Sequence, residues 1–241
     1  MKSYASFCPV AKTSEFFAER WTPLLLREFC LGATRFSELQ QGIPMISKAL
    51  LAQRLRELEA VGIIEKSSAE QGAGSIYRLT PAGEALRPLI DMMAEWGQAH
   101  GRNRVDLSDT DPEQLMWAIR RHLNTDHIPA DRLVVQFEFT GIPKNHRISR
   151  YWWIVMETEG IDVCQKNLGF EVDVTITADL RTFTLVWLGF KGLKEAQRQG
   201  HVRMTGPAKT IAKVCQAFEL RDQPWHRSFN FSLRSNPFQP L

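Results

Sequence analysis

The chain lacks the long apolar runs that a membrane protein or a secreted precursor needs. No stretch of about 18 consecutive apolar residues occurs in its 241 residues, and the opening MKSYASFCPV has no apolar core of a signal peptide. The sequence therefore predicts a cytoplasmic protein that does not use a membrane as a partner.

Cysteine is scarce, and its spacing excludes two classes of small stabilised fold. The four cysteines, Cys8, Cys30, Cys164 and Cys215, are far apart and form no CxxC pair. Neither a zinc site nor a disulfide framework is indicated.

The sequence also lacks the common catalytic motifs. It contains no GxSxG elbow, no HExxH, no P-loop and no GxGxxG fingerprint. His122 and His127, with Asp126 beside the second, could be imagined as metal ligands, but a spacing of five residues does not put both histidines on one helical face. A solvated helix end is the better interpretation of His122. We expect no catalytic residues, no metal and no cofactor, and hence no enzyme.

Composition is ordinary for a globular protein and sets only loose limits. The chain is 44% hydrophobic and 24% charged, with a formal net charge of +3. That charge permits a nucleic-acid partner without arguing for one. The length suits two domains, which we place at residues 1–104 and 112–236 in an α+β chain.

Residues 47–62, SKALLAQRLRELEAVG, predict the helix around which the first domain is organised. Ser47 is a good N-cap and Gly62 a good C-terminal stop. Leu51, Leu55 and Leu58 form one narrow apolar stripe at helical spacing. The opposite face holds Ala49, Ala52, Gln53 and Arg56, flanked by Lys48 and Arg54. Small side chains followed by long donors would let this face approach base edges and phosphates, although an ordinary solvated face would look similar.

The surrounding segments predict a winged helix-turn-helix. Two helices meet near residues 20–22, and a short helix at 35–41, with Ser37 as its cap, leads through a turn into the helix just described. Two short strands follow, joined by a polar tip near residues 71–75. Another helix begins at Pro81, and Pro88 should kink it or shift its true start.

Over residues 7–97 the chain resembles the HxlR-type bacterial transcriptional regulators. The features that carry the likeness are Cys8-Pro9, Trp21, the RFSEL segment, the helix SKALLAQRLRELE and the LTPAG segment at 79–83. The resemblance implies a homodimer on operator DNA, held together by the N-terminal segment and the helix after the wing. By position it implies a DNA-contacting set of Ser47, Lys48, Ala49, Gln53, Arg54 and Arg56 in the major groove, with Gln71 and Ser75 at the wing tip.

Cys8 has two interpretations. In some relatives a cysteine in this context senses oxidants or electrophiles, which requires exposure and a lowered thiol pKa. A buried cysteine of the dimer interface would explain the same residue.

The second half changes character after the polar stretch at residues 101–114. A helix is predicted at 112–123, followed by strands at 134–139, 151–157, 161–166, 170–178 and 182–190. Alternation of apolar and polar residues around Val174 predicts a sheet with one buried face. Helical pieces are predicted at 177–180 and 193–200, then a strand at 201–206 and a last helix at 207–220.

This order of parts, over residues 112–220, resembles the sterol carrier protein fold, a lipid-binding α+β domain. The closing part of the pattern is carried by Gly200, Arg203, Gly206 and the helix from Lys209 to Phe218. The resemblance implies an apolar pocket, for which Trp152, Phe183, Trp187 and Phe190 are candidate lining residues. The resulting hypothesis is a homodimeric regulator modulated by an apolar small molecule. The alternatives are thiol sensing through Cys8, and a constitutive DNA binder with a lipid-binding or structural second domain.

Overall fold

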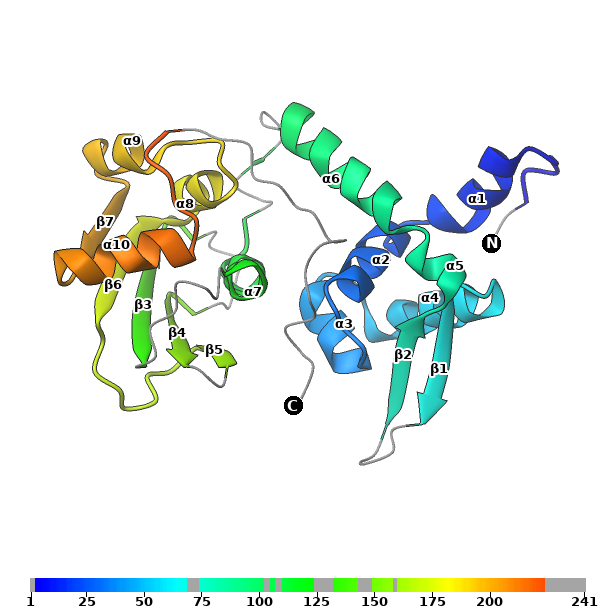
Figure 1. Ribbon diagram of the computed structural model, residues 1–241, viewed down its shortest axis with the longest axis horizontal. Coiled ribbons are helices and arrows are strands. Elements are labelled where there is room, and N and C mark those ends of the chain that lie inside the picture. The colour runs from blue at the N-terminus through cyan, green and yellow to red at the C-terminus, as the bar shows by residue number, and fades with distance from the viewer. Residues whose placement is uncertain are drawn as a thin grey trace. The chain divides into compact units, whose positions relative to one another are not determined.

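The computed structural model describes residues 3–68, 74–101, 105–106, 110–123, 132–142, 149–157 and 160–223 (Figure 1). These residues form two compact units, one up to Trp96 and one from Gly97 onward. The boundary falls inside a helix, ahead of the polar stretch at 101–114. Within the ranges given above, no helix is long and apolar enough to cross a membrane.

The first unit opens with four helices. They are α1 (Pro9–Phe17), α2 (Thr22–Cys30), α3 (Phe36–Gly42) and α4 (Lys48–Ala60). The predicted break between the first two helices is confirmed. Ser37 does not cap α3, because the helix already begins at Phe36 and the Glu38 carboxylate accepts from the Arg35 N–H at 2.9 Å.

A two-stranded wing follows α4. Strands β1 (Ile64–Ser68) and β2 (Ser75–Leu79) pair antiparallel, with Ile64 opposite Leu79. Figure 1 shows this hairpin extending away from the helices. The chain continues through α5 (Pro81–Glu84) and α6 (Arg87–His100), so that Pro88 is the second residue of α6 and shifts its start.

The core of the first unit lies between its helices and the base of the wing. Leucines from α2, α3 and α4 meet there, and Leu25, Leu39 and Leu51 are each 0% exposed. Phe16 and Phe17 of α1 pack against this core from its edge. The apolar stripe predicted for α4 therefore has the partner that it requires.

The second unit is a mixed sheet with helices. Its elements are α7 (Pro112–His122), β3 (Leu133–Thr140), β4 (Tyr151–Glu157), β5 (Gly160–Cys164), β6 (Val174–Asp179), α8 (Leu180–Trp187), α9 (Leu193–Arg198), β7 (Val202–Thr205) and α10 (Ala208–Ala217). The strand order is β5-β4-β3-β6-β7, and every pair is antiparallel except β3 with β6.

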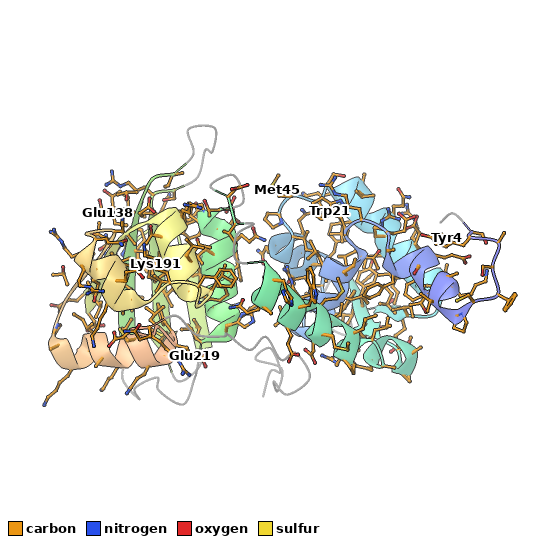
Figure 2. The ribbon with its side chains drawn as sticks, turned by 90° about the horizontal axis from the view of Figure 1, so that it is seen from above. Tyr4, Trp21, Met45, Glu138, Lys191 and Glu219 are labelled. Atoms are coloured by element: carbon orange, nitrogen blue, oxygen red, sulfur yellow. The ribbon has the colours of Figure 1, made fainter. Side chains whose placement is uncertain are left out.

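One face of this sheet forms the core of the second unit. Phe137 of β3 is fully buried and contacts the rings of Phe183 in α8 and Phe218 after α10. The register places Trp152 and Ile176 on the same face. The opposite face carries half-buried polar residues such as Glu138, which Figure 2 labels. The predicted alternation in β6 is confirmed, because Val174 and Ile176 are buried and Thr175 and Thr177, which alternate with them, are half-buried.

Three predictions for the second half are wrong. Residues 182–190 do not form a strand, because α8 occupies Leu180–Trp187 with the Asp179 side chain accepting from the Thr182 N–H. Residues 177–179 belong to β6 and not to a helical piece. His122 is only 7% exposed, with its ring edge against Trp187, so it is not a solvated helix end.

Candidate nucleic-acid interface

Helix α4 is anchored on one side and capped at its start. Leu51, Leu55 and Leu58 are 0–2% exposed. The Ser47 side chain accepts from the Leu50 N–H at 3.3 Å, as predicted for an N-cap. Gly62 adopts φ +71°, the left-handed conformation that ends a helix at little cost for glycine. The direction and length of the helix are thereby fixed.

The outward face of α4 carries most of the residues predicted to contact DNA. Five of these residues are exposed on this face or directly before it: Ser47, Lys48, Ala49, Gln53 and Arg56. Ala52, on the same face, is half-buried. The Gln53 amide donates to the Glu57 carboxylate at 2.9 Å. This face combines a small first turn with a long amide and a guanidinium further along, which is the chemistry suited to a major groove.

Arg54 lies beside this face, as predicted, but its side chain is engaged within the protein. Its side chain is only 12% exposed and forms ion pairs with Glu19, at 2.7 Å, and with Glu57. Its Nε also donates to the Arg20 carbonyl at 3.3 Å. Arg54 thus ties α4 to the joint between α1 and α2.

We expect Arg54→Ala to lower the free energy of unfolding by about 1–3 kcal/mol at neutral pH, since charged hydrogen bonds are lost. Burial is the largest single influence on the pKa of the Glu57 carboxyl, and it raises that pKa. The hydrogen bonds from Gln53 and Arg54 together outweigh burial, so the pKa lies below its ordinary value of 4.5. A lowered folded-state pKa stabilises the fold above pH 4.5 and loses that effect as the pH falls through the folded value. Urea unfolding should therefore show the difference between variant and wild type shrinking as the pH falls below 4.5.

The exposed Arg56→Ala serves as the control for this experiment and should leave stability nearly unchanged. A deficit in Arg54→Ala that does not vary with pH would show that the side chain acts through packing alone.

The wing supplies further exposed cations. Ser75, at the start of β2, is half-buried, and Gln71 lies outside the described residues. Lys66 on β1 and Arg78 on β2 are exposed, and they were not among the predicted DNA contacts. The sequence signal that could have identified them is that both are cations within the predicted strands of the wing.

The LTPAG segment fixes the wing to the end of α4. The Thr80 hydroxyl donates to the Gly62 carbonyl at 2.6 Å and accepts from the Gly83 N–H at 3.2 Å. A Cβ at Gly83 would lie 2.2 Å from the Ile63 carbonyl oxygen, so only glycine permits this approach. The segment therefore sets where the wing stands relative to the helix.

The N-terminal segment folds back on α1. The Glu15 carboxylate accepts from the Tyr4 N–H at 3.0 Å and from the Ser3 hydroxyl and the Lys12 ammonium. These contacts, the Tyr4 N–H first among them, lower the pKa of Glu15. Cys8 is exposed at the N-cap position of α1.

Large apolar side chains are exposed on this segment, on α1 and on α6. They are Tyr4, Phe7, Val10, Met92, Met93 and Trp96, with exposed fractions from 45% to 98%. Figure 2 labels Tyr4 on the N-terminal segment. Exposed apolar side chains gathered on a few elements are typical of a protein interface.

The four candidate pocket residues lie in the second unit. Phe183 packs on Phe137, with centroids 5.6 Å apart, and Trp187 is 5% exposed beside His122. Trp152 is 2% exposed and its indole donates to the Ser149 carbonyl at 2.9 Å. Phe190, after α8, is half-buried. Phe183 and Trp152 belong to the layer between the sheet and its helices, where protein side chains pack against one another.

No group of three or more His, Cys, Asp or Glu side chains in the described part of the chain could hold a metal ion. Burial raises the pKa of the Cys30 and Cys215 thiols to about 11, which keeps both protonated at neutral pH.

A helix-turn-helix followed by a two-stranded wing defines the winged-helix class of DNA-binding domain. The chain belongs to the HxlR-like helix-turn-helix family, which matches residues 16–105. That family relationship makes it a DNA-binding transcriptional regulator.

Relatives from Bacillus subtilis (strain 168) include three HTH-type transcriptional regulators. YdeP is 34% identical over 41% of this chain and 77% of its own length. YkvN is 32% identical over 48% of this chain and 99% of its own length, and YodB is 36% identical over 38% and 83%. Among solved structures, the redox regulator HypR in its reduced form is 33% identical over 38% of this chain and 92% of that chain, with a TM-score of 0.36.

Proposed function

We propose that this protein binds a two-half-site operator as a homodimer, and that an apolar small molecule held by the second unit modulates the binding. The observation that carries the DNA part is the outward face of α4, where Ala49, Gln53 and Arg56 stand exposed at the start and middle of a rigidly anchored helix. Selection of binding sites from a random duplex pool by the full chain tests it directly. Enrichment of an inverted repeat is expected, and no enrichment above the starting pool would refute it.

Arg56 is proposed to contact a phosphate, because it is the exposed guanidinium on this face. Arg56→Ala should then weaken binding evenly across sequences and lower the slope of log affinity against log salt by about one. Fluorescence anisotropy on the selected operator and on an unrelated duplex, at several salt concentrations, measures both effects. An unchanged slope would place the DNA on another face of the helix.

The homodimer is proposed to form through the exposed apolar side chains of the N-terminal segment, α1 and α6. Phe7 is 98% exposed, Val10 73% and Met92 64%. Side chains of this size left in water disfavour the monomer, and covering them by a second copy would remove that cost. A two-fold dimer would also match an inverted-repeat operator.

The effector site is proposed for the layer between sheet and helices in the second unit, as in a sterol-carrier-like domain. The helices that cover one face of the sheet, and the strand that ends before Gly206 and α10, support that assignment. Trp152, Phe183, Trp187 and Phe190 are the proposed lining residues. A ligand would have to displace or rearrange some of these rings to enter.

Native mass spectrometry of the purified full chain tests the effector. A dimer with an extra mass that organic extraction removes is expected, together with a changed operator affinity of the extracted protein. An effector changes DNA binding only if it binds one conformation of the protein better than another. An operator affinity that is unchanged after extraction would therefore indicate a constitutive DNA binder.

Thiol sensing through Cys8 is the second candidate function, favoured by the exposure of Cys8 at the start of α1. Under this candidate, Cys8→Ser should abolish any change in operator affinity caused by diamide. An unaltered response in the variant would remove Cys8 from consideration.

A further inference from the structure

The turn between α3 and α4 holds a large apolar side chain in water. Met45 is 74% exposed, although the isoleucines on either side of it in the turn, Ile43 and Ile46, are only 3% and 2% exposed. Figure 2 labels Met45 on this turn. A single exposed apolar residue is common on protein surfaces, so its surroundings decide whether it carries information.

The backbone of this turn is fixed. The Ile46 N–H donates to the Ile43 carbonyl at 3.1 Å, and the Gln40 side-chain amide donates to the Ile46 carbonyl at 2.8 Å. Two buried side chains and two hydrogen bonds thus set the position from which Met45 projects. Its exposure is a consequence of the turn's geometry.

Met45 stands at the N-terminal end of α4, two residues before the Ser47 cap. Ala49, two residues after that cap, is exposed as well. In a helix-turn-helix the N-terminal residues of the second helix reach the base edges. The end of α4 that would enter the groove first is therefore apolar at Met45 and at Ala49, and the polar Gln53 and Arg56 follow one and two turns later.

We propose that Met45 reads the 5-methyl group of a thymine in the major groove, an inference that rests on the proposed function of operator binding. Thymine is the base that presents an apolar group in that groove. Methionine suits the contact because its unbranched thioether adapts to an irregular surface. Cytosine, adenine and guanine carry no methyl group there, so the contact would favour thymine at one position of each half-site.

Replacing thymine by deoxyuridine tests this assignment, because it removes the methyl group and leaves base pairing and the groove's hydrogen-bonding pattern intact. The operator is the sequence that the full wild-type chain selects from random duplexes, and each thymine is exchanged singly. We expect wild type to lose about three- to fivefold in affinity at one position of each half-site, the worth of one buried methyl. Met45→Ala and Met45→Gln should bind the thymine operator more weakly and show equal affinity for the two bases at that position.

Val61→Ala is the matched control. Val61 is also an exposed apolar residue, 39% exposed, but it lies at the C-terminal end of α4, and its variant should keep the wild-type discrimination. Two outcomes would overturn the role of Met45 without affecting operator binding. In one, deoxyuridine at any position leaves the affinity of wild type unchanged; in the other, Met45→Ala still discriminates fully between thymine and deoxyuridine. If wild type selects no sequence at all, the proposed function fails together with this inference.

Discussion

Met92→Glu is expected to convert the protein into a monomer and to weaken its binding to a two-half-site operator by about 100-fold or more. Met92 is 64% exposed on α6, among the apolar side chains proposed for the dimer. In a two-fold interface each substitution is introduced twice, so two carboxylates would have to be covered against apolar surface. Once the dimer is lost, the second half-site no longer gains from an effective local concentration.

Sedimentation equilibrium measures the monomer directly, and anisotropy with one-half-site and two-half-site duplexes separates the two losses. Affinity for a single half-site should stay within about twofold of wild type, because α4 is untouched. Ala82→Glu adds the same charge to an exposed position of α5 and should leave the dimer intact. If Met92→Glu remains a dimer, the interface must be sought elsewhere.

The first unit could be predicted from sequence because its signals are local and agree with one another. Ser47 as a cap, Gly62 as a stop and the leucine stripe between them specify α4 without knowledge of the rest of the chain. The same holds for the strands of the wing, which lie in the two segments where they are predicted.

Arg54 shows why the interface could not be read from residue type alone. At the sequence level it is one more cation beside an exposed helical face, equivalent to Arg56. Its partner Glu19 lies 35 residues away, and only the fold brings the two together. A cation near a DNA-binding surface can therefore serve the scaffold instead of the ligand.

Residues 182–190 predict a strand because threonine, phenylalanine, valine and tryptophan favour extended structure when taken one at a time. The spacing of Leu180, Phe183 and Val186 decides for a helix, since their side chains share one buried face, and Asp179 caps its start. Tertiary packing and a cap override intrinsic preference here. Aromatic side chains at such core positions fill a core and line a cavity equally well, so residue type alone does not distinguish the two roles.

Phe137→Ala separates these roles. Phe137 is fully buried, and its ring centroid lies 5.6–5.9 Å from those of Phe139, Phe183 and Phe218. Truncation of this side chain should therefore lower the free energy of unfolding of the second unit by about 3–5 kcal/mol. Calorimetry would show an early transition assigned to this unit. Phe137→Leu, which keeps most of the volume, should lose much less.

The functional readout of Phe137→Ala distinguishes a regulatory second unit from an inert one. If an apolar effector acts through the layer around Phe183, the variant should bind operator within about threefold of extracted wild type and no longer respond when the extracted ligand fraction is added back. The response should return in Phe137→Leu, because the aliphatic side chain supports the same layer. A full response in a Phe137→Ala protein whose second unit has unfolded would place the effector outside this layer.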